Sequence, residues 1–404
     1  MQCEQNMLTF CKNRNNPFSR ARFFFSKLPS VIVPVKKISA AVGLALAISS
    51  AYAQTDSANV ATDSATADTA THFQWWSAVP VLGYTEETEL QFGAMVNFFI
   101  PSSFKGGNSQ EIDIAAYGST RKQFQFAATP YFYLAHDRIS GWLDFRYQNW
   151  VGHFFGIGND VDMDDYISFD RETFFFMALV ESNLGLPPSL QFFRYGMVLD
   201  INHSVMEFKE YDGDIALPAN PDGWRTALGY HLTVDTRDNP NWARHGMYLQ
   251  WEHRFYTDAI GDFGFTYQEL DLRTYGETIW NTSMAVGLMW QRSDGDVPFE
   301  YMAGPDGIKR FRGVEMKYFR DNQALMMQVE LRKELFWRLA GDIFFEGGKV
   351  GPYFSQLLRN EWHRSVGFGG KFALNKSERL YARAEFSWVD FKSLGMTFYF
   401  REAF

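Results

Sequence analysis

The chain has 404 residues, a formal net charge of -9 and 46% hydrophobic residues. Its longest apolar run, roughly residues 38–53, is diluted by serine and glycine and is shorter than the about 20 residues that a spanning helix needs, which argues against a bundle of transmembrane helices. Aromatic residues reach 18%. A soluble domain rarely has room for so many large rings, whereas a β-barrel in lipid carries them on its outer wall and rims. Composition therefore favours a membrane β-barrel, with a large soluble β-sandwich as the alternative.

The N-terminal residues 1–53 have the pattern of an export signal. Two lysines precede the apolar run, which ends in the small-x-small tripeptide 51–53. The part before the lysines is long, so either the signal has an extended beginning or translation starts downstream of Met1. Residues 54–72 are low-complexity Ala, Ser, Thr and Asp, and we expect a disordered periplasmic tail there.

Removal of the signal changes the chemistry of the chain. Cys3 and Cys11 leave with it, so we expect no disulfide, no thiol nucleophile, no lipid anchor and no cysteine metal site in the mature protein. The mature chain would carry 31 basic and 46 acidic residues. This excess of negative charge argues against nucleic acid as a partner.

The rest of the chain, residues 73–404, has one uniform pattern and is expected to form a single outer-membrane β-barrel. Apolar and polar residues alternate in segments of about ten residues, the length of a tilted strand that crosses a bilayer. In 380–388, for example, Leu, Ala, Ala, Phe and Trp alternate with Tyr, Arg, Glu and Ser. The polar face carries full charges, as expected for a face that lines a lumen.

The pattern predicts about sixteen antiparallel strands, an even number that places both termini on one side of the membrane. Tight turns and long connections alternate, which predicts short periplasmic turns, long external loops and a periplasmic N-terminus. Two connections on the predicted periplasmic side are exceptions, because 101–109 and 236–244 are long. The predicted strands are 75–84, 89–100, 110–119, 122–134, 137–149, 168–182, 189–210, 223–235, 245–256, 264–275, 278–291, 323–333, 338–346, 362–373, 379–389 and 394–404.

The last predicted strand ends on alternating aromatic residues. Phe398, Phe400 and the terminal Phe404 resemble the signal that the barrel-assembly machinery reads during biogenesis, although Glu402 departs from the aromatic residue usual at its position. This resemblance implies that the assembly machinery and outer-membrane lipid are partners of the chain.

The connection between the eleventh and twelfth strands contains Phe311-Arg312-Gly313. It resembles the large loop of the BamA/TamA-type outer-membrane assembly and translocator superfamily (bacterial surface antigen family), in which the loop folds back into the lumen. A second segment, 344–348, resembles the family's Phe-x-Asp-x-Gly on the thirteenth strand, with Glu346 where Asp is usual. The resemblance implies contact between Arg312 and Glu346, and a tight turn of the loop at Gly313. In the alternative, Arg312 is a solvated loop charge and Glu346 has another partner.

A third segment resembles the family's periplasmic turn after the eighth strand. It contains Asp235, Arg237, Asp238 and Pro240. Such residues favour turns and local hydrogen bonds, so a structural role is expected. The segment 155–160 is also similar to an external loop of the family. Members that insert or secrete proteins generally carry periplasmic polypeptide-transport-associated (POTRA) domains before the barrel. None is expected within this sequence, so the resemblance implies a barrel-only member, served by a periplasmic accessory protein if it handles polypeptides.

The sequence offers no enzyme motif. There is no HExxH, no GxSxG and no Walker loop. His203 and Ser204 are adjacent in a strand and point to opposite faces, so they cannot form a dyad. The aspartates in 160–165 lack the Gly and distal Glu of a calcium loop, which favours a solvated acidic loop over a metal site. The glycines of 367–370 are expected to mark a bend or a close approach. We expect no enzyme activity, cofactor or metal.

Three functions remain open. The resemblance favours a translocator or assembly barrel that moves an exported polypeptide, or lipid, at the outer membrane, with the loop closing the lumen. A passive or ligand-selective channel is the second hypothesis, because sixteen strands leave a lumen wide enough for water. A structural surface antigen is the third.

Overall fold

The computed structural model describes residues 75–85, 89–104, 107–209, 211, 213–219, 222–376, 379–400 and 403, all of which belong to the compact unit Ala70–Phe404. The predicted export signal, the predicted tail and Phe404 lie outside the described residues. None of the helices in the described part of the chain has the length and apolarity to cross a membrane.

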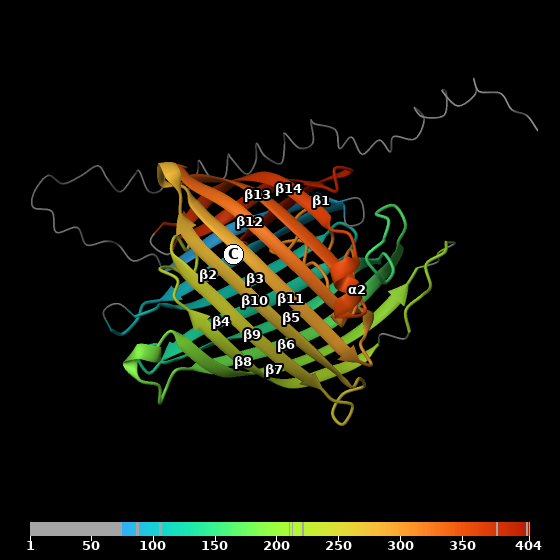
Figure 1. Cartoon of the computed structure of the whole chain (residues 1–404), viewed down its shortest axis with the longest axis horizontal. Helices are drawn as coiled ribbons and strands as arrows, with labels where there is room; N and C mark the ends of the chain where they lie inside the picture. Colours follow the sequence, from blue (N-terminus) through green and yellow to red (C-terminus); the bar gives the residue numbers. More distant parts are fainter. Residues whose placement is uncertain are drawn as a thin grey trace, which may run out of the picture. The chain divides into compact units, whose positions relative to one another are not determined.

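Sixteen strands form one sheet in which each strand pairs antiparallel with the next (Figure 1). Among the described residues, β1 pairs with β2, β16 pairs with β15, and no backbone pairing joins β1 to β16. The strands are β1 (Trp76–Thr85), β2 (Glu89–Ile100), β3 (Gln110–Ser119), β4 (Phe124–Leu134), β5 (Ile139–Phe154), β6 (Ile167–Ser182), β7 (Phe193–Phe208), β8 (Gly223–Asp235), β9 (Gly246–Tyr256), β10 (Phe265–Glu277), β11 (Ser283–Gly295), β12 (Gln323–Phe336), β13 (Leu339–Gly351), β14 (His363–Asn375), β15 (Leu380–Val389) and β16 (Ser393–Phe400). The short helices are η1 (Pro188–Leu190), η2 (Ile279–Asn281), η3 (Phe299–Tyr301) and α2 (Phe354–Arg359).

The predicted number and order of strands are confirmed, and the differences lie at strand ends. β5 continues to Phe154 and β13 to Gly351, several residues beyond their predicted ends, because each keeps pairing with its neighbour. The predicted strand 189–210 begins only at Phe193, since η1 precedes it. The predicted strand 394–404 is described from Ser393 to Phe400 as β16, and residues 401, 402 and 404 lie outside the described residues.

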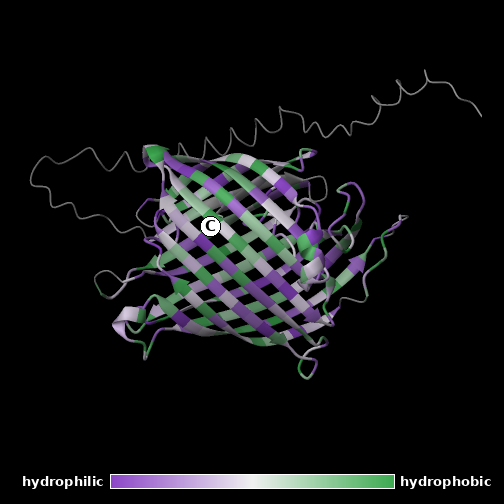
Figure 2. Cartoon of the chain, viewed as in Figure 1, coloured by the Kyte–Doolittle hydropathy of each residue, from purple (hydrophilic) through white to green (hydrophobic). Residues whose placement is uncertain are grey.

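The two faces of the sheet are inverted relative to a soluble protein. Along β15, Arg383 and Glu385 are fully buried, whereas Phe386 and Trp388 are exposed. On β14, the Phe368 side chain is 62% exposed and Lys371 is buried. Figure 2 shows the resulting alternation of apolar and polar residues along the strands. This pattern fits an apolar outer wall in lipid around a charged lumen, and it excludes the soluble sandwich, which would bury its apolar face.

The connections divide the barrel into two ends. We call the end with the β4–β5 and β12–β13 turns the short-turn end, and the end with the β5–β6 loop (155–166) and the β11–β12 loop (296–322) the long-loop end. Exposed aromatic residues lie at both ends, as expected for the two membrane–water interfaces. At the short-turn end they include Trp75, Trp76, Trp280, Phe336 and Trp337, and at the long-loop end Trp224, Tyr353, Phe354 and Phe391.

Candidate functional site in the lumen

The β11–β12 loop lies against the charged, buried face of the sheet. The Arg310 guanidinium donates to Asp271 on β10 at 2.5 Å, the Gln328 amide of β12 donates to the Lys309 carbonyl, and Ser365 of β14 donates to the Arg312 carbonyl at 2.8 Å. A solvated external loop would make none of these contacts.

Arg312 is at the centre of the contact between loop and wall. Its Nε donates to Glu346 at 2.8 Å, and its Nη1 donates to Glu330 and Glu385 at 2.9 Å each. The backbone N–H of Arg312 donates to the second oxygen of Glu346 at 2.5 Å. All four side chains are fully buried. The structure thus brings Arg312 and Glu346 together as the family resemblance implies, and adds two glutamates from β12 and β15 that the motifs did not identify.

Further cations balance these carboxylates. Lys371 of β14 lies 2.8 Å from Glu330 and 2.9 Å from Asp342, and Arg383 pairs with Glu385. One oxygen each from Glu330, Asp342 and Glu385 could in principle hold a cation, since these atoms lie within 4.8 Å of one another. Lys371 and the arginines already supply positive charge there. The cluster is therefore an ion-pair network, in which removal of one member leaves a buried, unpaired charge.

Missing side chains make room for this cluster. A Cβ on Gly367 would lie 2.2 Å from the ring of Phe344. The guanidinium carbon of Arg312 lies over the same ring, 3.5 Å from the ring centroid. A Cβ on Gly369 would lie 2.5 Å from the Glu385 side chain. The expectation of a close approach in 367–370 is confirmed at these two positions, while a Cβ on Gly370 would meet nothing within 4 Å.

Gly313 permits the loop to turn at the wall. Its φ of +93° is one that residues with a side chain rarely adopt, and a Cβ there would lie 2.4 Å from the Ser387 Cβ on β15. Phe311 also has a positive φ and is fully buried, with its ring 5.2 Å from that of Phe319. The three residues of this segment therefore have distinct contacts. Phe311 packs in an apolar cluster, Arg312 binds carboxylates, and Gly313 contacts β15.

The apolar cluster around Phe311 joins the two loops of the long-loop end. Phe155 of the β5–β6 loop belongs to it. The backbone N–H of Gly158 donates to the Arg320 carbonyl at 2.8 Å, and the Asn159 side-chain oxygen accepts the N–H of Val350 at 2.8 Å. This junction of loops was not predicted; the only sign of it was the similarity of 155–160 to a family loop.

The β8–β9 connection (236–245) holds its own shape through the residues that the sequence singled out. Asp235 pairs with Arg237 at 2.7 Å, and Arg237 also donates to the Pro240 carbonyl at 3.3 Å. The Asp238 carboxylate accepts the backbone N–H groups of Arg244 and His245. These are the local hydrogen bonds expected of a turn.

The same connection also places Trp242 against distant strands. Trp242 is 1% exposed and lies 4.7 Å, ring to ring, from Tyr381 of β15. Arg332 of β12 lies over the Trp242 ring and donates to the Ala243 carbonyl. The connection is long because it reaches the buried face of β12–β15 at the short-turn end. Sequence reasoning missed Trp242, since an aromatic residue in a turn of a membrane protein is usual at an interface.

The predicted C-terminal assembly signal is described in part. Phe398 and Phe400 belong to β16, and Phe404 lies outside the described residues. Ala403 is buried, packs with Tyr275 of β10, and its carbonyl accepts a hydrogen bond from Arg310 at 2.9 Å. Ala403 therefore contacts the β11–β12 loop.

Comparisons by sequence give no match, either to a protein-family model or to a curated protein. Among solved structures, BamA from Haemophilus ducreyi lacking POTRA domains 1–3 is similar at 10% identity and a TM-score of 0.51, over 81% of this chain and 69% of that one. CdiB from Acinetobacter baumannii is similar at 9% identity and a TM-score of 0.50, over 82% of this chain and 60% of that one. The chain thus spans less than two thirds of CdiB. The chain has the fold of the BamA/TamA-type outer-membrane β-barrels.

Proposed function

We propose that the protein is a translocator-type barrel that moves polypeptide, or lipid, into or across the outer membrane, and that the β11–β12 loop closes its lumen at rest. The observation that carries the proposal is Arg312, buried between Glu330, Glu346 and Glu385 of three different strands. A buried ion cluster adds little stability compared with apolar packing of similar volume. We therefore infer that this cluster serves to hold the loop in one position. No catalytic chemistry is part of this proposal.

In this proposal the short-turn end faces the periplasm, and a separate periplasmic protein delivers the cargo. Trp242 and the β8–β9 connection lie at that end, so a cargo that enters there meets this connection before it meets the β11–β12 loop. A passive channel is the second candidate, and the number of strands favours it. The β11–β12 loop and the β8–β9 connection both lie against the lumen wall, and this favours the closed translocator.

Conductance in planar bilayers separates the two candidates. For a closed translocator we expect the native barrel to conduct rarely, and Arg312→Ala to raise the open fraction. Arg359→Ala, on the exposed surface of α2, is the matched control and should leave the open fraction unchanged. A large pore that is always open in the native protein and insensitive to Arg312→Ala would overturn the closed-lumen proposal.

The transport role needs a cellular measurement. We expect deletion of the gene to lower the amount of a subset of outer-membrane or exported proteins, or to change the lipid composition of the outer leaflet. Re-expression of the native chain should restore them, and Arg312→Ala should restore them only in part. An unchanged protein and lipid profile would favour a channel or a structural surface antigen.

A further inference from the structure

His363, the first residue of β14, lies between two segments of the long-loop end. Its Nδ1 lies 2.7 Å from a carboxylate oxygen of Asp390 in the β15–β16 turn, and its Nε2 lies 2.7 Å from the carbonyl oxygen of Asn159 in the β5–β6 loop. Its ring also stacks on that of Phe319 in the β11–β12 loop, with 4.5 Å between the centroids. One side chain therefore contacts the β15–β16 turn and both loops that meet at this end.

Both ring nitrogens of His363 face groups that accept hydrogen bonds. A backbone carbonyl can only accept, and so can a carboxylate that is ionised at neutral pH. A neutral imidazole has one N–H group and one nitrogen with a lone pair, whereas an imidazolium has two N–H groups. Only the protonated, positively charged form of His363 can therefore donate to Asp390 and to Asn159 at the same time.

The charges around His363 favour this protonated form. Asp390 pairs with it directly, and Asp160 of the β5–β6 loop adds a second negative charge. The other titratable groups of these segments are Lys392, which acts on Asp390 from the same turn, and Tyr318 of the β11–β12 loop. Burial and then the carboxylates of Asp390 and of three loop aspartates raise the pKa of Tyr318 to about 12, so its phenol stays neutral. An imidazole beside carboxylates keeps its proton to a higher pH than the about 6.5 at which a free histidine titrates.

Asn159 is the point at which the β5–β6 loop is held to β13 and β14. Its side-chain oxygen accepts the Val350 N–H at 2.8 Å, and its side-chain amide donates to the Glu361 carbonyl at 3.1 Å. Loss of the His363 proton would leave a lone pair 2.7 Å from either the Asn159 carbonyl or the Asp390 carboxylate. Two acceptors at that distance repel each other, so one of the two contacts then opens.

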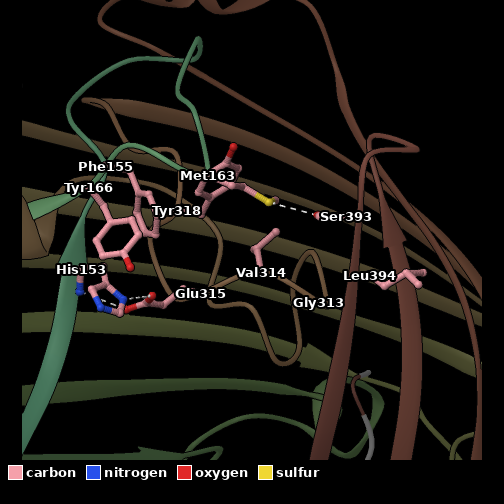
Figure 3. A pocket seen from close by; sticks show the side chains of 10 residues that line it. All are labelled: His153, Phe155, Met163, Tyr166, Gly313, Val314, Glu315, Tyr318, Ser393 and Leu394. Atoms are coloured by element: carbon pink, nitrogen blue, oxygen red, sulfur yellow. Dashed lines mark hydrogen bonds and ion pairs between the residues drawn. The ribbon is translucent and has the colours of Figure 1, made fainter. Parts of the chain in front are cut away.

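A second histidine at the same end does not need a charge. His153, near the end of β5, lies beside Glu315 of the β11–β12 loop at a cavity of about 230 Å³ (Figure 3). Its Nδ1 lies 2.6 Å from one carboxylate oxygen, and its backbone N–H donates to the other at 3.0 Å. Within the described part of the chain its Nε2 makes no hydrogen bond. A neutral imidazole can make this contact with its single N–H, so His153 is a matched control for His363.

We propose that His363 is a pH-sensitive latch, which as an imidazolium holds the β5–β6 loop and the β15–β16 turn together and which releases one of them when it loses its proton in an alkaline medium. The state of the long-loop end then follows the pH of the medium on its side of the membrane. This inference does not depend on the proposed transport function, because it concerns how the two segments are held and not what passes through the barrel.

The charge of His363 can be measured directly. We expect the nitrogen NMR signals of the imidazoles, recorded on the full chain in detergent, to show two protonated nitrogens for His363 at pH 7. The loss of these signals in His363→Gln assigns them. The proton should be lost only above the about pH 6.5 at which a free histidine titrates. A neutral His363 at pH 7 would overturn the proposal.

Spin labels on the two segments test the release. Ile157→Cys in the β5–β6 loop and Phe391→Cys in the β15–β16 turn replace side chains that are each 52% exposed, and the described part of the chain has no cysteine of its own. In singly labelled chains we expect both labels to be immobile at pH 7, and at least one of them to become mostly mobile by about pH 10. Labels that both stay immobile up to that pH would overturn the latch.

Variants of the two histidines separate the latch from other groups that titrate in this range, such as Lys392. His363→Arg keeps the positive charge and several N–H donors at high pH, so both labels should stay immobile throughout. His363→Gln is uncharged at any pH, and the label that responds in the native chain should be mobile already at pH 7. His153→Gln should leave the response to pH as in the native chain. An equal response to pH in His363→Arg, or its loss in His153→Gln, would overturn the assignment to His363. Heat-modifiable migration on gels shows that each variant is folded.

Discussion

Gly313 of the β11–β12 loop and Gly395 of β16 meet backbone to backbone. A Cβ on Gly395 would lie 2.2 Å from the carbonyl oxygen of Gly313 and 2.6 Å from its Cα. The loop therefore contacts the last strand of the barrel directly, and the absence of a side chain on Gly395 makes the contact possible.

We expect Gly395→Ala to push the loop away from β16. Overpacking of a close contact costs about 1–3 kcal/mol, so the free energy of unfolding should fall by that amount and the open fraction in planar bilayers should rise. Gly370→Ala is the control, because a Cβ there meets nothing and stability should hold. Equal effects of the two substitutions on conductance would contradict the contact.

Removal of the Arg312 side chain should leave three buried carboxylates without their shared cation. We expect Arg312→Ala to lower the free energy of unfolding by about 3–5 kcal/mol, measured by urea titration in detergent. The double variant Arg312→Met with Glu346→Gln should recover part of this loss, since it removes one of the unpaired charges. No recovery would show that the network acts through packing and not through charge.

The length of Glu346 matters because it reaches both the side chain and the backbone N–H of Arg312. Glu346→Asp keeps the charge but is one methylene shorter, so we expect it to lose one of the two contacts and about 1–2 kcal/mol. Glu346→Gln keeps the length and loses the charge, and it should cost more because Arg312 loses a counter-ion. The order of the two unfolding free energies is the measurement, and a larger loss in Glu346→Asp would contradict the importance of charge.

Trp242 should close the short-turn end independently of the loop. We expect Trp242→Ala to cost about 3–5 kcal/mol, because a large buried ring leaves a cavity, and to admit a thiol reagent to a cysteine placed at Ala340, its neighbour in the core. Trp337→Ala, at an exposed ring, should change stability by less than about 0.5 kcal/mol and should not alter labelling. Unchanged labelling in Trp242→Ala would mean that the Trp242 side chain does not block access of the reagent from the short-turn end.

Asp390, in the β15–β16 turn, gives the long-loop end a dependence on pH. Its carboxylate lies 2.7 Å from the His363 Nδ1 and accepts the Arg364 backbone N–H, and the His363 Nε2 lies 2.7 Å from the Asn159 carbonyl oxygen of the β5–β6 loop. Burial alone would raise the pKa of Asp390, but the hydrogen bonds from His363 and Arg364 lower it below its ordinary value of 3.8.

A lowered carboxyl pKa contributes stability above the ordinary value and loses it as the pH falls through the lowered one. We therefore expect Asp390→Ala to destabilise the barrel by about 1–2 kcal/mol at pH 7. The difference from the native chain should shrink below pH 3.8 and vanish at lower pH. Urea titrations at pH 7 and pH 3 measure it, and a difference that is the same at both values would exclude the carboxylate as its cause.

The sequence by itself determined the strands and their two faces. Alternation with a period of two is a local property of an extended chain, so Arg383 and Phe386 could be assigned to lumen and wall without knowledge of any neighbour. The same reasoning gave the number of strands, and it failed only at ends such as Phe154 and Gly351, where pairing between strands continues past the apolar pattern. The family motifs further suggested Arg312 with Glu346.

Only the tertiary structure decided which lumen residues meet. Alternation shows that Glu330 and Glu385 face inward, but not that one guanidinium from a loop reaches both, because that depends on the path of the loop and on the stagger of three strands. Trp242 could not be placed for the same reason: its partner Tyr381 is distant in sequence, and no local pattern encodes a contact across the lumen.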